Sequence, residues 1–266
     1  MKIGILGLGV VGSAVEMGLR ELGHKVTFYD PKIEGSRFKD VLDTHICFLC
    51  VPTPPGPDGK CDTAIVEKSV AKLHANHYNG TIAIKSTVEP GTTQRLTEKY
   101  STLDICFVPE FLRERCAVVD FIENHDLCVV GTTNNNTFNK VKKAHGHYPD
   151  KVVQLSPTEA ELVKYYNNIY NATLIILANS FYEVCEHLDA DYTAVKSALT
   201  NRTHISNSYL QCNDNFRGFG GVCLPKDTLA IATLVREASL DVDFFQMLLD
   251  ENDKYKITVY EGMRKQ

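Results

Sequence analysis

The stretch Gly7-Leu8-Gly9-Val10-Val11-Gly12 decides how this chain folds. It follows the apolar run Ile3–Leu6 and opens the helix-like stretch Val10–Leu22, which is the context that a G-x-G-x-x-G pattern requires. The first glycine permits a tight turn, the second lets a pyrophosphate approach the backbone, and the third allows close helix packing. The amide groups at the start of the helix face the anion. The residues predicted to line this dinucleotide site are Gly7, Gly9, Val10, Val11 and Gly12.

An acidic residue selects the cofactor. Asp30 follows the second apolar run, Lys25–Tyr29, roughly 20 residues after the glycines. A carboxylate at this place accepts hydrogen bonds from a ribose diol and repels a 2′-phosphate. The sequence therefore predicts NAD rather than NADP.

The surrounding sequence indicates a doubly wound α/β domain over residues 1–155. Helix-like stretches such as Val10–Leu22, Asp62–Ala75 and Thr92–Tyr100 separate short, nearly continuous apolar runs. Such an alternation is typical of a parallel sheet that helices cover on both faces, the Rossmann type. The predicted strands are Ile3–Leu6, Lys25–Tyr29, His45–Val51, Thr81–Ser86, Asp104–Val108 and Asp126–Gly131.

The pattern changes after residue 155, and residues 156–266 are predicted to be all-helical. Thr158–Leu188 carries apolar residues at helical spacing without an internal Gly or Pro, which predicts one helix of about thirty residues. Further helices are expected within Ala190–Asn201, Lys226–Ala238 and Val242–Tyr260. The loop Asn213–Pro225 contains several glycines and needs flexible backbone.

Composition excludes several classes of protein. The 266 residues are 44% hydrophobic, with 28 Lys plus Arg against 33 Asp plus Glu, so no charge excess favours nucleic acid. The apolar stretches are too short to cross a membrane. Nine cysteines without a secretion signal predict reduced thiols and a cytoplasmic protein. We predict no metal, because Cys47 and Cys50 point to opposite faces of a strand and the histidines lack partners at ligand spacing.

A lysine and an asparagine stand one turn apart on the predicted long helix. Lys164 and Asn168 share one face, so they can point an ammonium and an amide at one oxygen that becomes negative during a reaction. Solvated surface is the alternative for such a pair. The spacing is also similar to the Lys-x-x-x-Asn pair of the β-hydroxyacid dehydrogenase superfamily, whose members join a dinucleotide fold to a helical domain.

The segment Gly218-Phe219-Gly220-Gly221-Val222-Cys223-Leu224-Pro225-Lys226-Asp227 resembles the nucleophile loop of the UDP-glucose/GDP-mannose dehydrogenase family. Other blocks of this family occur in the same order along residues 1 to about 255. They are Val51-Pro52-Thr53-Pro54, Ser86-Thr87-Val88, Pro90-Gly91-Thr92, Pro109-Glu110-Phe111-Leu112-Arg113-Glu114 and Glu161-Leu162-Val163-Lys164.

The resemblance implies oxidation of a nucleotide-sugar C6 alcohol to a carboxylate in two hydride transfers to NAD. Cys223 would attack the aldehyde and carry a thiohemiacetal and then a thioester. Asp227, with Lys164 as its partner, would be the base apparatus, and Lys164 with Asn168 would stabilise the oxyanion. Glu114 would manage the hydrolytic water with help from Thr87, and Glu110 is a second candidate for that role.

The resemblance also implies binding residues. The cofactor set adds Val51, Pro52, Thr53, Ser86, Thr87, Glu114 and Lys226 to the glycine turn and Asp30. The substrate set is Glu110, Phe111, Leu112, Arg113, Lys164, Asn168, Tyr209, Phe219, Gly220 and Cys223.

The substrate expected from the resemblance is UDP-glucose, because Val51-Pro52-Thr53-Pro54 is more similar to that branch than to the GDP-mannose branch. Family members form dimers through the long helix, so a homodimer is expected. They also continue into a third, nucleotide-binding domain, whereas this sequence stops at Gln266. His204 stands where the family has an arginine. Two alternatives stay open: an NAD-binding protein that is catalytically weak or silent, and a β-hydroxyacid dehydrogenase that performs a single hydride transfer.

Overall fold

The computed structural model describes residues 1–255, which divide into two compact units. Unit 1 comprises Met1–Pro55 and Cys61–Lys164, and unit 2 comprises Gly56–Lys60 and the described part of Tyr165–Gln266. The division lies inside the long helix α6 (Pro157–His187), whereas the change in sequence pattern predicts a boundary after residue 155. The difference arises because the first turns of α6 pack with the sheet, where Ala160 joins a core of unit 1.

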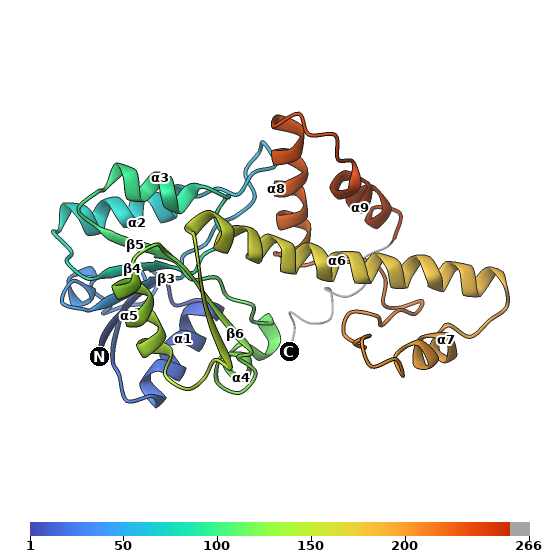
Figure 1. Cartoon of the computed structure of the whole chain (residues 1–266), viewed down its shortest axis with the longest axis horizontal. Coiled ribbons are helices and arrows are strands. Elements are labelled where there is room, and N and C mark those ends of the chain that lie inside the picture. The colour runs from blue at the N-terminus through green and yellow to red at the C-terminus, as the bar shows by residue number, and fades with distance from the viewer. Residues whose placement is uncertain (256–266) are drawn as a thin grey trace. The chain divides into compact units, whose positions relative to one another are not determined.

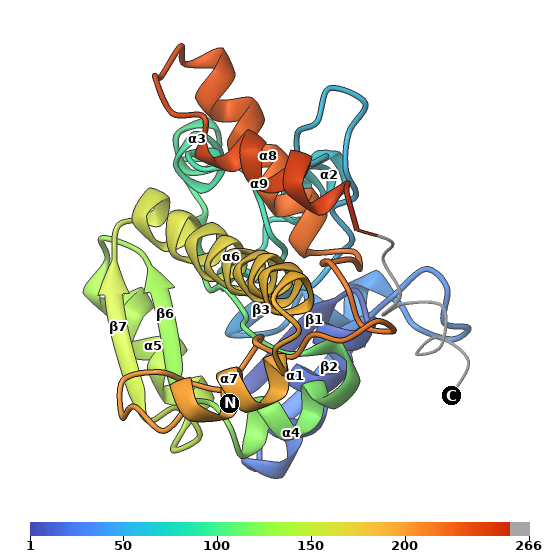
Figure 2. The same cartoon turned by 90° about the vertical axis from the view of Figure 1, so that its right-hand side faces the viewer.

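Unit 1 is built on a seven-stranded sheet in the order β2-β1-β3-β4-β5-β6-β7. Strands β1 to β5 are parallel, as predicted, while β6 pairs antiparallel with β5 through Phe107 and Gly131 and parallel with β7. Figure 2 shows β6 and β7 together at one edge of the sheet. The strands are β1 (Lys2–Leu6), β2 (Lys25–Tyr29), β3 (Ile46–Leu49), β4 (Thr81–Ile84), β5 (Asp104–Phe107), β6 (Leu127–Gly131) and β7 (Lys151–Leu155).

Helices cover both faces of this sheet (Figure 1). One core lies under α1 (Val10–Glu21), α4 (Ala117–Ile122) and α5 (Asn135–His145). The other lies under α2 (Ala64–Ala75) and α3 (Thr92–Lys99). Alternate residues of each strand enter opposite cores, because successive side chains of a strand point to opposite faces. Two short 3₁₀ helices, η1 (Phe38–Val41) and η2 (Glu114–Cys116), complete the unit.

Unit 2 is helical and forms two cores along α6. One core packs α6 with α8 (Leu224–Glu237) and α9 (Phe244–Asn252), and it includes the ring of Phe219. The other packs α6 with α7 (Tyr192–Leu199) and the following loop. Gly218 and Gly221 have φ of +61° and +84°, so the predicted need for flexible backbone in this loop is confirmed.

The doubly wound fold, the helical second half and the single long helix are therefore confirmed. The sheet is mostly parallel, and the exception is that β6 and β7 run against the other strands. The sequence prediction also missed β7, because the polar Lys151 and Gln154 leave only a short apolar run in this strand. Helix α9 ends at Asn252, and residues 256–260 of the predicted helix lie outside the described residues. No helix in the described part of the chain is both long and apolar enough to span a membrane.

Candidate functional site

The glycine turn after β1 has the close contacts that its sequence predicts. Gly7 has φ +87°, and its N–H donates to Tyr29 O over 2.9 Å. A Cβ at Gly7 would lie 2.6 Å from Cys50 O, and a Cβ at Gly12 would lie 2.0 Å from Gly7 O. Both positions therefore exclude any larger side chain, because real Cβ atoms do not approach backbone so closely.

Gly9 differs from the other two glycines. A Cβ at Gly9 would meet no heavy atom within 4 Å, so open space lies beside the backbone where α1 begins. No side chain caps this helix start, and Val10 is 46% exposed. An uncapped helix N-terminus beside open space suits the pyrophosphate of a dinucleotide.

Asp30 is fixed next to this turn. Its Oδ2 accepts from Leu8 N over 2.8 Å, and its Oδ1 accepts from Lys32 N over 2.9 Å. These two backbone hydrogen bonds lower the pKa of Asp30, so the carboxylate stays charged. A fixed, charged acceptor at the end of β2 fits a ribose diol. Within unit 1, the glycine turn and Asp30 can thus hold the dinucleotide that the sequence predicts.

The other predicted cofactor residues of unit 1 follow β3 and β4. Ser86 Oγ donates to Val51 O over 2.7 Å, which joins the ends of these two strands. Thr87 O accepts from Cys61 Sγ over 3.2 Å. Pro52 is exposed and Thr53 is half-buried. Because β1, β3 and β4 are parallel neighbours, their carboxyl ends share one edge of the sheet with the glycine turn.

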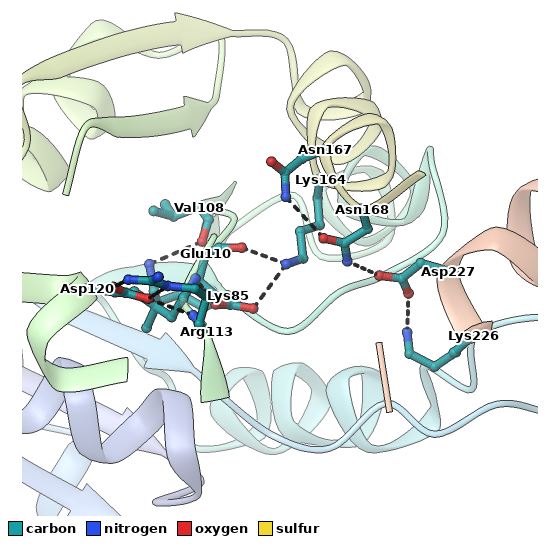
Figure 3. Close-up of polar contacts among 11 residues, drawn as sticks. Lys85, Val108, Glu110, Arg113, Asp120, Lys164, Asn167, Asn168, Lys226 and Asp227 are labelled. Carbon is teal, nitrogen blue, oxygen red and sulfur yellow. Dashed lines mark hydrogen bonds and ion pairs between the residues drawn. The ribbon is translucent and has the colours of Figure 1, made fainter. Parts of the chain in front are cut away.

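Lys164 is buried and paired with Glu110. Its Nζ donates to Glu110 O over 2.7 Å and to Glu110 Oε1 over 3.2 Å, with the two side chains 5% and 12% exposed (Figure 3). Glu110 Oε2 also accepts from Leu112 N over 2.8 Å. The alternative interpretation, that Lys164 is a solvent-exposed surface residue, is therefore wrong. Its predicted partnership with Asp227 stays a prediction, and Glu110 is a partner that the sequence interpretation missed.

Asp120 holds the loop after Glu110. Its carboxylate accepts from Arg113 N, Nε and Nη2 over 2.9, 2.9 and 2.6 Å. Cys116 Sγ and Asn124 Nδ2 also donate to it. The Arg113 guanidinium keeps the pKa of this carboxyl well below its usual range. Arg113, predicted to bind substrate, thus has a structural partner within unit 1, and Glu114 is exposed at the start of η2.

In unit 2, Asp227 joins α8 to α6. It is fully buried, and its Oδ2 accepts from Asn168 Nδ2 over 2.6 Å while its Oδ1 accepts from Lys226 Nζ over 2.6 Å (Figure 3). The Lys226 side chain is only 7% exposed. A buried carboxylate with an amide and an ammonium donor is a fixed acceptor in a low-dielectric setting. Asn168 is therefore not a surface residue either.

Cys223 is exposed, in contrast to the other eight cysteines, which are buried or half-buried. It is the N-cap residue of α8, and its carbonyl accepts from Asp227 N over 2.9 Å. The N-terminus of a helix stabilises negative charge, so this place favours a thiolate. Burial raises the pKa of the Cys50 thiol to about 12 and of the Cys128 thiol to about 11. The alternative interpretation, that Cys223 is a buried structural thiol, is therefore wrong.

Other predicted residues lie in different surroundings. Phe219 is 1% exposed, so its ring is part of a core of unit 2 rather than a surface that could contact a sugar. Tyr209 is 37% exposed with φ +63°, and His204 is exposed. Gly220 is half-buried, as are Phe111 and Leu112 of unit 1. Among residues 1–255, no three His, Cys, Asp or Glu side chains gather closely enough to hold a metal ion.

The fold and the glycine turn define a dinucleotide-binding protein. Residues 32–148 match the NAD binding domain of the UDP-glucose/GDP-mannose dehydrogenase family, and residues 158–254 match the central domain of the same family. The chain belongs to this family, and NAD is the cofactor of its first domain.

Individual relatives agree with this assignment. The chain is 28% identical to UDP-glucose 6-dehydrogenase TuaD of Bacillus subtilis, with 98% of this chain and 65% of the relative covered. It is 28% identical to UDP-glucose 6-dehydrogenase AglM of Haloferax volcanii over 95% of this chain and 70% of the relative. The structure of a UDP-glucose dehydrogenase from Pyrobaculum islandicum superposes with a TM-score of 0.83 at 27% identity, covering 95% of this chain and 68% of that one. The chain thus spans about two thirds of these relatives' length.

Proposed function

We propose that the protein oxidises the C6 alcohol of UDP-glucose to the carboxylate of UDP-glucuronate, with two NAD reduced per substrate. The observation that carries this proposal is the exposed Cys223 at the N-terminus of α8. The names of the relatives, UDP-glucose 6-dehydrogenases, support the substrate. Bound NAD supplies the hydride acceptor for both oxidations.

Cys223 retains the substrate between the two oxidations. The first oxidation turns the C6 alcohol into an aldehyde, and the Cys223 thiolate adds to its carbonyl carbon to form a thiohemiacetal after protonation of the oxygen. Loss of hydride from that carbon, together with loss of the proton from its hydroxyl oxygen, gives a thioester. Water then attacks the thioester carbonyl, the C–S bond breaks, and the products are the carboxylate and the regenerated thiol.

The buried polar groups supply the acid–base and electrostatic steps. Asp227 is the base for the alcohol and the later water, and its hydrogen bonds to Asn168 and Lys226 fix its orientation. Lys164 and Asn168 stabilise the oxygen that becomes negative. Glu110 keeps the Lys164 ammonium in place through the ion pair. Glu114 and Thr87 bind the hydrolytic water.

The decisive experiment counts NADH with excess NAD and a limiting, known amount of UDP-glucose. The expected result is two NADH per UDP-glucose for the parent protein and no second NADH for Cys223→Ala. Cys128→Ala, which removes a thiol buried in β6, is the matched control and should still form two NADH per UDP-glucose.

The other outcomes decide between the alternatives. One NADH per substrate, unaffected by Cys223→Ala, would identify a single-step dehydrogenase. No NADH with retained NAD binding would identify a silent NAD-binding protein. The same assay with GDP-mannose tests the choice of nucleotide sugar.

We further propose a homodimer through α6 and a cytoplasmic location. Exposed apolar side chains follow one stripe of this helix, and a partner helix would cover them. They are Tyr166, Tyr170, Leu177, Phe181 and Val184, with Leu188 directly after the last residue of the helix. Analytical ultracentrifugation of Phe181→Asp tests the dimer, because a charge in the contact should give monomers. The proposed cytoplasmic location is supported by the nine cysteines, all of which are free thiols in residues 1–255.

A further inference from the structure

Two buried asparagines of unit 2 hold the start of the loop that carries Cys223. Asn179 lies in the C-terminal half of α6 and is 1% exposed, and Asn252 is the last residue of α9 and is 4% exposed. Their side chains bind the backbone of Gly218 and Phe219. Neither asparagine belongs to the sites described above.

Asn179 accepts two hydrogen bonds on one oxygen. Its Oδ1 accepts from Gly218 N over 3.1 Å and from Arg217 Nε over 2.8 Å, while its Nδ2 donates to Ile175 O over 2.8 Å. Gly218 has φ +61°, so its N–H is part of a sharp turn that other residues rarely adopt. The oxygen of Asn179 therefore satisfies the buried amide at the point where the chain turns.

Asn252 pairs with Phe219 in both directions. Its Oδ1 accepts from Phe219 N over 2.7 Å, and its Nδ2 donates to Phe219 O over 3.0 Å. The ring of Phe219 is packed in the core with Tyr165 and Ile176. Backbone and side chain of Phe219 are thus both held, which explains why this residue of the glycine loop is buried.

Arg217 adds a third contact at the same place. Its guanidinium carbon lies 4.8 Å from the ring centroid of Tyr182 and 4.9 Å from that of Tyr255, and it pairs with Glu183. Cation–π contacts on two rings and an ion pair orient the side chain that Asn179 also binds.

The loop is also fixed on its other side. Cys223 O accepts from Asp227 N over 2.9 Å in the first turn of α8, and Asp227 is bound by Asn168. Between Phe219 and Cys223 only three residues remain, two of them glycines. Because glycine imposes little order of its own, the position of Cys223 depends on what is fixed at the two ends.

We propose that Asn179 and Asn252 are positioning residues for the nucleophile, and this inference rests on the proposed role of Cys223. By anchoring Gly218 and Phe219, they keep the thiolate at the N-terminus of α8, where the helix stabilises its charge. Neither residue touches substrate or cofactor in this proposal. Their contribution is a loop held in one conformation before the substrate binds.

The test separates the hydrogen-bond acceptor from packing. Asn179→Leu and Asn252→Leu keep the volume and remove the acceptors, Asn179→Asp keeps the acceptor for Gly218 N and Arg217, and Gln246→Leu on the exposed side of α9 is the matched control. Three measurements are made: deuterium uptake of peptides covering Gly218 and Phe219, the pH profile of Cys223 alkylation by iodoacetamide, and kcat with KM for NAD.

Both leucine variants should exchange these amides about tenfold faster than the parent, with kcat lower by about the same factor. The alkylation profile of Cys223 should move to higher pH, while KM for NAD stays within about twofold. Gln246→Leu should match the parent, and Asn179→Asp, which keeps the acceptor for Gly218 N but loses the donor to Ile175 O, should lie between the parent and Asn179→Leu. Leucine variants with parental exchange, alkylation and kcat would overturn the proposal, and so would an Asn179→Asp variant as impaired as Asn179→Leu.

A further variant covers the case in which a leucine variant does not fold. Asn252→Asp keeps the acceptor for Phe219 N but turns an oxygen toward Phe219 O, so faster exchange and a lower kcat are expected. Parental values in this variant would count against the proposal. Deuterium exchange and Cys223 alkylation can be measured whether or not the protein oxidises UDP-glucose. If the parent forms no NADH from UDP-glucose while these two measurements change as expected, the proposed function fails and the anchoring stands.

Discussion

The amide of Asn168 donates to Asp227 across 2.6 Å, so a residue in the middle of α6 binds the first turn of the helix that Cys223 caps. Asp227 also accepts from Lys226, and all three side chains are buried. The carboxylate is the central member of this group, because it receives both donors.

Replacing Asp227 by Asn should destabilise unit 2. The substitution leaves the buried Lys226 ammonium without its counter-charge, which costs about 3 kcal/mol of the free energy of unfolding. Urea denaturation at pH 7.5 measures this loss. Asp241→Asn, at an exposed position, is the control and should change the free energy by less than about 0.5 kcal/mol. An unchanged free energy of unfolding for Asp227→Asn would contradict a stabilising role of the Lys226–Asp227 ion pair.

Gly9 and Gly12 should respond differently to alanine. At Gly9 the added Cβ meets no atom, so Gly9→Ala should keep the parental melting temperature and weaken NAD binding, because the methyl group occupies space meant for the pyrophosphate. At Gly12 the Cβ would lie 2.0 Å from Gly7 O, so Gly12→Ala should lower the melting temperature. Calorimetric NAD titration and thermal unfolding measure the two effects. Equal melting temperatures for both variants would refute this distinction.

Asp120→Asn should loosen the loop that begins at Glu110. The variant weakens the ion pair with Arg113, so we expect KM for the nucleotide sugar to rise about tenfold while the Kd of NAD stays unchanged. Steady-state kinetics measure KM for the nucleotide sugar, and NAD titration measures the Kd of NAD. Glu123→Gln, exposed at the end of the same helix, is the control. A rise in the Kd of NAD without a rise in KM for the sugar would show that the loop has another role.

The buried His145 and the half-buried His125 should make stability depend on pH. Burial lowers the pKa of His145 to about 3 and of His125 to about 4, with Lys85 as a further cause, and the two rings lie 5.7 Å apart. The unfolded chain binds protons below about pH 6.5, whereas the folded chain does not. The stabilisation is therefore complete above pH 6.5 and is lost as the pH falls toward 4.

The variant His145→Leu isolates one of these groups. Between pH 6 and 4.5 it should reduce the slope of unfolding free energy against pH by about 1.4 kcal/mol per pH unit, the value for one proton. Urea denaturation at several pH values measures the slope. The exposed His187→Gln should leave it unchanged. A parental slope in His145→Leu would mean that this ring is protonated in the folded protein.

Features that depend on neighbouring residues are predictable from the amino-acid sequence. The glycine turn, Asp30 after β2, the uninterrupted α6 and the loop of Cys223 each lie within one short segment. Backbone preferences of glycine, helical periodicity and chain order suffice to predict them, because few distant residues take part.

The pairing of buried polar groups depends instead on how distant segments of the chain pack. Lys164 binds Glu110, 54 positions away, and Asp227 binds Asn168, 59 positions away. Sequence spacing carries no information on such pairs, since they arise where packing buries a charge and a partner must compensate it. The same holds for Asn252 and Phe219, 33 positions apart, and for the ring of Phe219, which packs in a core of unit 2.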